Sequence, residues 1–230
     1  MGKSVRWVIG AVVAVVLAVV LGPWVYINFV KSDAPERLSV DTAAQSSTPT
    51  STTAGAPATG TDGTWKVATG SQAGYRVKEI LFGQSTEAVG RTSDVTGQIE
   101  VQGARVPSGE FSVDMASVAS DESRRDNQYR RVMDVSSNPT STFKLTQPIE
   151  LGSVPGDGEK AAASATGDLT LRGTTRNVTI PVEVLRSGST VKVSGSFPIT
   201  FADWGIPNPS FGPAETADNG VLEFLLVLNR

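Results

Sequence analysis

The 230-residue chain contains no cysteine and no histidine. Without histidine, neither a Ser-His-Asp triad nor a Cys-His pair can form, and zinc sites built from either residue are excluded. Without cysteine, the chain has no disulfide, no thiolate chemistry and no lipid attached through a cysteine. The nucleotide-binding motifs G-x-x-x-x-G-K-[ST] and G-x-G-x-x-G are also missing. Because these absences remove the commonest catalytic groups, we predict that the protein is not an enzyme.

A single match to a catalytic motif needs an explanation. The residues from Ser141 to Lys144 fit the S-x-x-K pattern of penicillin-recognising enzymes, but the companion S-D-N and K-T-G motifs are absent. The segment has the pattern of a strand, which would place Ser141 and Lys144 on opposite faces. We therefore interpret it as part of a sheet.

Charge is missing from a long stretch near the N-terminus. Residues Trp7 to Val30 are uncharged and consist mostly of Val, Ala, Leu and Ile. As a helix this run would span roughly 36 Å, enough to cross a hydrocarbon core of about 30 Å. A cleaved signal peptide is the alternative, but its apolar region is usually about 7–15 residues long. We predict one uncleaved transmembrane helix within residues 1–30, which makes the chain a single-pass protein of the cell membrane with its C-terminal domain on the extracytoplasmic side.

The rest of the chain divides into two parts. Between Asp41 and Thr61 there is no aromatic residue and no Val, Ile or Leu, so this stretch cannot bury enough apolar surface to offset the entropy of ordering it. We predict a disordered Ser/Thr/Pro/Ala-rich linker over residues 31–61 and a single domain over 62–230. After the four basic and three acidic residues before Asp62 are set aside, 16 basic and 20 acidic residues remain, a net charge of −4. Such a domain has no electrostatic footprint for nucleic acid.

Hydrophobic and polar residues alternate along much of residues 62–230, which is typical of strands with one buried face. Pro181 and Pro198 interrupt this pattern and predict sheet edges or bulges, because proline cannot donate to a strand ladder. The charged stretch Ser120–Val135 predicts a short helix, capped by Ser120 or Asp121.

The last apolar run, Val221–Leu228, has only eight residues and follows Gly220, which favours a central strand over a helix. Many short antiparallel strands with one helical interruption indicate a closed or nearly closed barrel, because closure removes exposed edges.

Several segments resemble the YceI-like, polyisoprenoid-binding proteins of bacteria, over about Gly63 to Arg230. The segment Thr166–Thr179 is similar to the family's G-x-L-T-[IL]-x-G-x-[ST]-[KR]-x-[VL] hairpin. Arg124–Tyr129 resembles its Arg-Asp-x-His segment, with Gln128-Tyr129 where the family has His, so any role of that histidine does not transfer. Further similar segments are the opening strand Gly63–Val67, the long strand Phe111–Val118 and the Tyr-Pro-x-x-x-Phe equivalent Asn138–Lys144.

The resemblance implies a mainly β, lipocalin-like antiparallel barrel whose apolar interior takes an isoprenoid chain. Each buried CH₂ of such a ligand would gain about 0.8 kcal/mol. We expect a carrier or storage protein for a prenyl quinone or polyprenyl lipid, with no other cofactor and no metal. The same inward-facing residues would also fill a small barrel, so an envelope stress or interaction module with a filled barrel stays open as the alternative. The oligomeric state is also left open.

The residues expected to contact the lipid are aromatic and flexible apolar side chains on inward faces, which offer large and adaptable surfaces. The Tyr75 hydroxyl is expected at the polar head group, and Trp204 at the mouth of the barrel. The full predicted set is Tyr75, Val77, Phe82, Val113, Met115, Phe143, Leu145, Leu171, Phe197, Ile199, Phe201 and Trp204.

Overall fold

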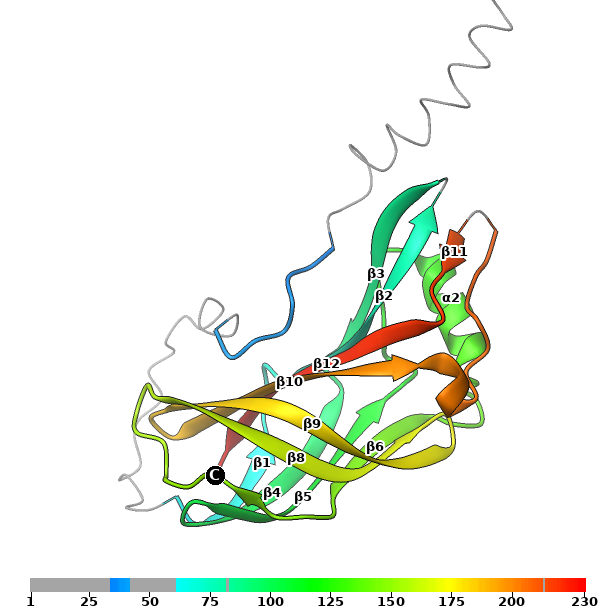
Figure 1. Cartoon of the computed structure of the whole chain (residues 1–230). Helices are drawn as coiled ribbons and strands as arrows, with labels where there is room; N and C mark the ends of the chain where they lie inside the picture. Colours follow the sequence, from blue (N-terminus) through cyan, green and yellow to red (C-terminus); the bar gives the residue numbers. More distant parts are fainter. Residues whose placement is uncertain (1–33, 42–60, 82, 213) are drawn as a thin grey trace, which may run out of the picture.

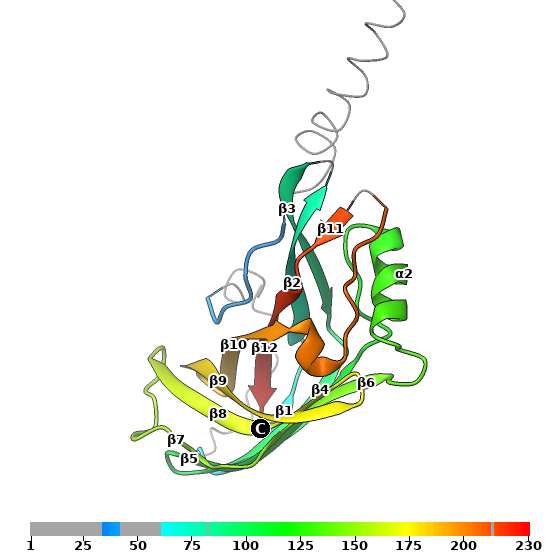
Figure 2. The ribbon, with the colours of Figure 1, turned by 45° about the vertical axis from the view of Figure 1, so that its right-hand side comes forward.

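The computed structural model describes residues 34–41, 61–81, 83–212 and 214–230. Its main feature is an antiparallel sheet that closes on itself, so the predicted barrel with a short helical segment is confirmed (Figures 1 and 2). Within these residues the ring consists, in spatial order, of β1 (Gly63–Val67), β4 (Val95–Gln102), β5 (Arg105–Asp114), β6 (Thr140–Leu145), β8 (Lys160–Leu171), β9 (Thr174–Ser187), β10 (Thr190–Thr200) and β12 (Asn219–Asn229). The pairing of β1 with β12 closes the ring.

A long hairpin extends one end of the barrel. It is made of β2 (Gln72–Leu81) and β3 (Gln84–Thr92), and the first half of β2 pairs with β12. The short strand β11 (Ala214–Thr216) pairs with the last residues of β2, close to the hairpin tip. At the opposite end, β7 (Ile149–Glu150) pairs with the start of β5. Both ribbon views place the hairpin tip and β11 together, beyond the ring and beside the helix (Figures 1 and 2).

The two strand prolines lie where the sheet opens, as predicted. Strands β9 and β10 are paired only from Val182↔Gly195 onward to their connecting turn. Pro181 pairs with β8 and Pro198 with β12, so each proline has its other edge free of a partner strand. Because proline lacks a backbone N–H, it fits such a free edge. The prediction that Val221–Leu228 forms a central strand is also confirmed, since β12 has neighbours on both edges.

The helix α2 covers Ser123–Val132 and lies inside the predicted stretch, but its predicted cap was wrong. The N-cap is Glu122, whose carboxylate accepts a hydrogen bond from the backbone N–H of Arg124 at 3.1 Å. Ser120 lies too early to reach the first free N–H groups. Its hydroxyl instead donates to the carboxylate of Asp126 at 2.7 Å, which ties the preceding loop to the first turn.

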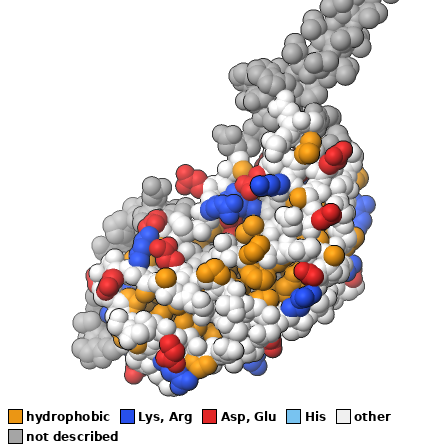
Figure 3. Space-filling model, viewed as in Figure 1, with side chains coloured by type: hydrophobic (Ala, Val, Ile, Leu, Met, Phe, Trp, Pro, Cys, Tyr) orange, Lys and Arg blue, Asp and Glu red, His pale blue; other side chains and the backbone are white. Residues whose placement is uncertain are grey.

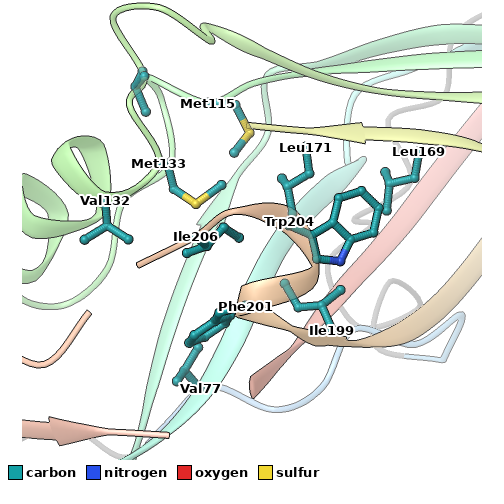
Figure 4. Packing of buried hydrophobic residues seen from close by; sticks show 11 residues of the cluster. Val77, Met115, Val132, Met133, Leu169, Leu171, Ile199, Phe201, Trp204 and Ile206 are labelled. Carbon is teal, nitrogen blue, oxygen red and sulfur yellow. The ribbon is translucent and has the colours of Figure 1, made fainter. Parts of the chain in front are cut away.

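A cluster of buried side chains packs α2 against one end of the barrel (Figure 4). Val132 and Met133, at the end of the helix, pack with residues of the one-turn helix η3 (Phe201–Trp204). Leu171 of β8 and Ile206 complete the contact. This cluster fixes the helix against the barrel wall.

Residues 34–41 lie against the outside of the barrel, although the predicted disordered linker included them. Val40 is fully buried and Leu38 is nearly so. In Figure 1 the segment runs beside β3 and then toward the ends of β8 and β9. Residues 31–33 and 42–60 of the predicted linker, and the predicted membrane helix, lie outside the described residues. In the part of the chain that the structure describes, no helix combines the length and the apolar character needed to cross a membrane.

A buried ion network connects this segment to the barrel. The carboxylate of Glu223 on β12 accepts from Arg76 Nε and Arg91 Nη2, both at 2.8 Å. The side chains of Arg76 and Glu223 are only 4% and 2% exposed. The same two guanidinium groups also donate to the backbone carbonyls of Pro35 and Glu36. The charges of Glu223, Arg76 and Arg91 are therefore compensated within the network, and the backbone of residues 34–41 supplies two of its hydrogen-bond acceptors.

The network predicts a large effect for removal of its central carboxylate. Glu223→Ala should lower the free energy of unfolding by about 3–5 kcal/mol, because it breaks a buried ion pair and leaves the buried guanidinium of Arg76 with only the partly exposed carboxylate of Glu87. Glu150→Ala is the matched control: it breaks the exposed pair with Arg105 and should cost less than about 1 kcal/mol. Urea denaturation of the two variants measures both values, and equal losses would contradict this account.

Candidate functional site

The interior of the barrel is hollow. It contains a cavity of about 890 Å³, within the roughly 300–1,000 Å³ typical of small-molecule sites. The cavity runs from Leu81 and Phe211 at the hairpin end to Val154 and Arg186 at the opposite end. Side chains from almost every strand of the ring line it. In the view of Figure 3, hydrophobic side chains gather over the middle of the sheet, where β9, β10 and β12 lie.

The alternation along each strand decides which side chains line the cavity, because successive residues point to opposite faces. On β12, Leu222 and Phe224 line the cavity, whereas Leu225 is buried on the outside. On β9, Ile180 and Val182 point inward in the same way. The inward positions in the middle of β9 and β12 are all apolar, so these two strands give the cavity an apolar wall.

Inward-facing glycines keep the cavity open. A Cβ atom on Gly90 would come within 2.4 Å of Tyr75 Cε1, and one on Gly195 within 2.6 Å of Phe224 Cζ. The aromatic rings therefore lie flat over glycines of neighbouring strands, an arrangement known from other sheets. Similar contacts join Gly97 with Phe111 and Gly167 with Phe143. Rings held against the wall line the barrel without filling it.

Polar groups in the cavity gather at the end near α2. The rings of Tyr75 and Tyr129 are stacked, with centroids 5.2 Å apart and an angle of 10° between their planes. Burial raises the pKa of both phenols, so both stay neutral donors at physiological pH. The Tyr129 hydroxyl contacts Met115 Sδ at 3.6 Å. The Tyr75 hydroxyl has no hydrogen bond to another described residue.

Arg125 lies beside the tyrosines, but its charge is already compensated. Its guanidinium pairs with Glu79 at 3.0 Å and also with Asp121. At the opposite end of the cavity, Arg186 Nη1 donates to the carbonyl of Pro155 at 3.4 Å. The buried Nε of Arg186 has no hydrogen-bond partner within the described residues. The polar groups thus mark the two ends of an otherwise apolar channel.

The predicted contact residues largely meet in this cavity. Those that line it are Tyr75, Val77, Val113, Met115, Phe143, Leu145, Leu171, Phe197, Ile199 and Phe201. Phe82 lies outside the described residues. That the lining residues contact a ligand stays a prediction.

The placement of Trp204 at the mouth was wrong. Its side chain is 2% exposed, packs in the buried cluster with Leu171 and Ile199 (Figure 4), and is not among the residues that line the cavity. The guanidinium of Arg176 lies 6.0 Å from its ring centroid and covers the outer side. The η3 turn folds the indole back into the core, which its Asp-Trp-Gly sequence did not indicate.

Sequence reasoning also missed several lining residues. Phe111, Leu222 and Phe224 line the cavity and were not predicted to do so. For Phe111, the period-2 alternation with Val113 was a usable signal. For Leu222 and Phe224 the signal was weak, because β12 is apolar on both faces. Within the described residues, no group of His, Cys, Asp or Glu side chains is arranged to hold a metal ion.

Comparison with known proteins identifies the family. The model of the YceI-like domain matches residues 65–228, so the chain belongs to the YceI-like domain family. The chain is similar to the structure of a polyisoprenoid-binding domain from Saccharophagus degradans implicated in plant cell wall breakdown, with 16% identity, a TM-score of 0.58 and coverage of 73% of this chain and 98% of that one. It is also similar to BcnA of Burkholderia cenocepacia, with 22% identity, a TM-score of 0.51 and coverage of 66% and 95%. No curated protein matches the chain.

The hollow interior predicts different results for two large-to-small substitutions. Phe197 lines the cavity and is only partly buried, so Phe197→Ala should cost clearly less than the about 3–5 kcal/mol of a filled core. Leu225→Ala is the control, because Leu225 is 4% exposed and does not line the cavity. It should cost about 2–5 kcal/mol. Chemical denaturation measures both, and a larger loss for Phe197→Ala would show that the ring packs a solid core.

Proposed function

We propose that the barrel binds an isoprenoid lipid inside its cavity, as a carrier or store and without catalysis. The observation that supports this most strongly is a large apolar cavity that extends from one end of the barrel to the other. A prenyl chain is long, flexible and apolar, and each of its buried CH₂ groups contributes about 0.8 kcal/mol. The related domain from Saccharophagus degradans is described as polyisoprenoid-binding. In this proposal the N-terminal run Trp7–Val30 anchors the barrel to the extracytoplasmic side of the membrane.

The alternative function, an interaction module, required a filled barrel. The aromatic rings that lie over Gly90 and Gly195 leave the interior open. An empty apolar cavity costs stability through lost packing contacts. A ligand that fills it recovers those contacts, which favours the binding function over the interaction module.

The head group of the proposed lipid is neutral, such as a quinone or an alcohol. Arg125, which lines the cavity beside the tyrosine pair, is held by two carboxylates, so it offers little attraction for a diphosphate. The Tyr75 hydroxyl can donate to a carbonyl or hydroxyl oxygen. A buried hydrogen bond between neutral groups fixes the orientation of the head group and increases the affinity only modestly.

The lipid itself can be identified directly. We expect a prenyl lipid when the purified protein is extracted with organic solvent and the extract is studied by mass spectrometry. Leu222→Trp should abolish loading, because the indole would project into the cavity from its partly buried lining position. Thr179→Trp, which adds the same ring to the exposed outer face of β9, should load normally. Repeated failure to extract or load any prenyl lipid would contradict the proposed function.

Head-group recognition predicts a selective effect of one hydroxyl. A prenyl quinone should compete with a bound fluorescent prenyl probe better than a prenyl diphosphate of equal chain length. Tyr75→Phe should weaken quinone binding about 2- to 10-fold, which corresponds to one neutral hydrogen bond of about 0.5–1.5 kcal/mol. Squalene, an isoprenoid without a head group, is the matched control and should bind both proteins equally. A preference for the diphosphate would overturn the assignment of a neutral head group.

A further inference from the structure

We propose that the hairpin end of the barrel faces the lipid bilayer and that an apolar rim, formed by Ile80, Leu81 and Phe211, contacts the membrane surface. This orientation rests on the membrane attachment proposed above. The new point is which end of the cavity lies next to the bilayer that supplies the lipid.

The first observation is the distribution of exposed apolar side chains. Among the described residues the large exposed hydrophobic side chains are Phe211 at 53%, Ile80 at 46% and Val154 at 39% exposure. Two of these belong to the rim, because β11 pairs with the end of β2 and Phe211 bridges to Ala214, the partner of Leu81. Ile80 and Leu81 are successive residues of β2 and point to opposite faces, so the hairpin end exposes apolar side chains on both of its sides, and exposed apolar surface gathered at one end of a molecule marks an interaction site.

The rim is continuous with the cavity. Leu81 and Phe211 are partly or largely exposed at the surface and also line the interior. Pro209 and Ala214 extend the same lining. A prenyl chain that passes these side chains would remain in contact with apolar surface from the outside to the lumen.

The path of residues 34–41 places the start of the described chain toward this end. The carbonyls of Pro35 and Glu36 accept hydrogen bonds from Arg76 and Arg91, and Ala34 lines a small surface pocket with Glu87 of β3. Glu87 lies three residues from Gln84, the first residue of β3 after the hairpin tip, a distance of about 10 Å along the strand.

At its other end the segment is held near the opposite end of the barrel. The carboxylate of Asp41 pairs with Lys160 Nζ at 2.6 Å, and Lys160 is the first residue of β8. The segment therefore crosses the outer face of the barrel with a fixed direction, from the hairpin end to the far end.

The length of the preceding chain limits where the membrane can lie. The predicted membrane run ends at Val30, and only three residues separate it from Ala34. Four Cα–Cα steps reach at most about 14 Å. A membrane surface within that distance of Ala34 lies close to the hairpin end of the barrel. The opposite end, with Lys160 and Val154, then points away from the membrane.

Charge beside the rim fits the same surface. The guanidinium of Arg131 lies 5.9 Å from the ring centroid of Phe211. Arg124 and Arg130 are exposed on the same helix. An aromatic ring flanked by cations suits the boundary between acyl chains and lipid phosphates.

The absence of cysteine makes the test simple. Ile80→Cys, Phe211→Cys and the control Val154→Cys each give the full chain one thiol, which is labelled with an environment-sensitive fluorophore. Each protein is reconstituted into vesicles of zwitterionic and anionic phospholipid, with or without a spin-labelled phospholipid as quencher. Flotation of the vesicles reports whether the chain is attached.

We expect the labels at positions 80 and 211 to shift their emission to the blue and to lose most of it to the quencher. The label at position 154 should keep its emission. Quenching at 154 but not at 80 and 211, or at none of the three in floating protein, would overturn the orientation. A chain that does not float would overturn the membrane attachment and this orientation together, whereas lipid loading in detergent would still test the cavity separately.

Discussion

The barrel depends on strand β12, which has paired neighbours along both edges. One edge pairs with β10 from Asn219 to Asn229, and the other pairs first with β2 and then with β1. Its inward face contributes Leu222 and Phe224 to the cavity, and its outward face carries the buried Leu225 and Glu223. The two arginines that pair with Glu223 also bind the backbone of residues 34–41. A strand that is covered on both faces has no wet side, which explains why Val221–Leu228 is apolar nearly throughout. Glu223 is the exception, and two arginines compensate its charge.

A closed barrel of this size can be either solid or hollow, and the placement of small residues decides between them. Large rings on inward positions would normally meet across the lumen. Here Tyr75 and Phe224 lie over glycines of adjacent strands and stay near the wall. The volume that glycine leaves free in the wall is occupied by a ring, and the centre of the barrel is left empty. The proposed binding of a flexible apolar chain follows from this arrangement, without any reactive group.

The polar groups of the cavity lie at its ends, which gives the apolar channel a direction. The stacked pair Tyr75 and Tyr129 lies at the end near α2, together with Arg125 and its carboxylates. The apolar rim with Phe211 lies at the same end. In the proposed function a lipid would enter tail first from the membrane side, and its head group would remain near the tyrosines. Residues 34–41 begin near the hairpin end, so the membrane anchor that the sequence predicts would lie at the same end of the barrel as the tyrosines and the apolar rim.

The sequence by itself determined the fold class and identified part of the apolar lining. The alternation along β5, β6, β8 and β10 was enough to predict an antiparallel barrel and inward residues such as Phe143 on β6 and Phe197 on β10, because side-chain direction in a strand depends only on its period of two. The two prolines likewise marked the free edges of β9 and β10. Only the tertiary structure decided that the barrel is hollow, that Trp204 is buried and that residues 34–41 pack on the wall. Each of these depends on contacts between segments far apart in the chain, such as Tyr75 over Gly90 or Arg76 with Pro35. The local sequence pattern does not determine which distant residue a side chain contacts.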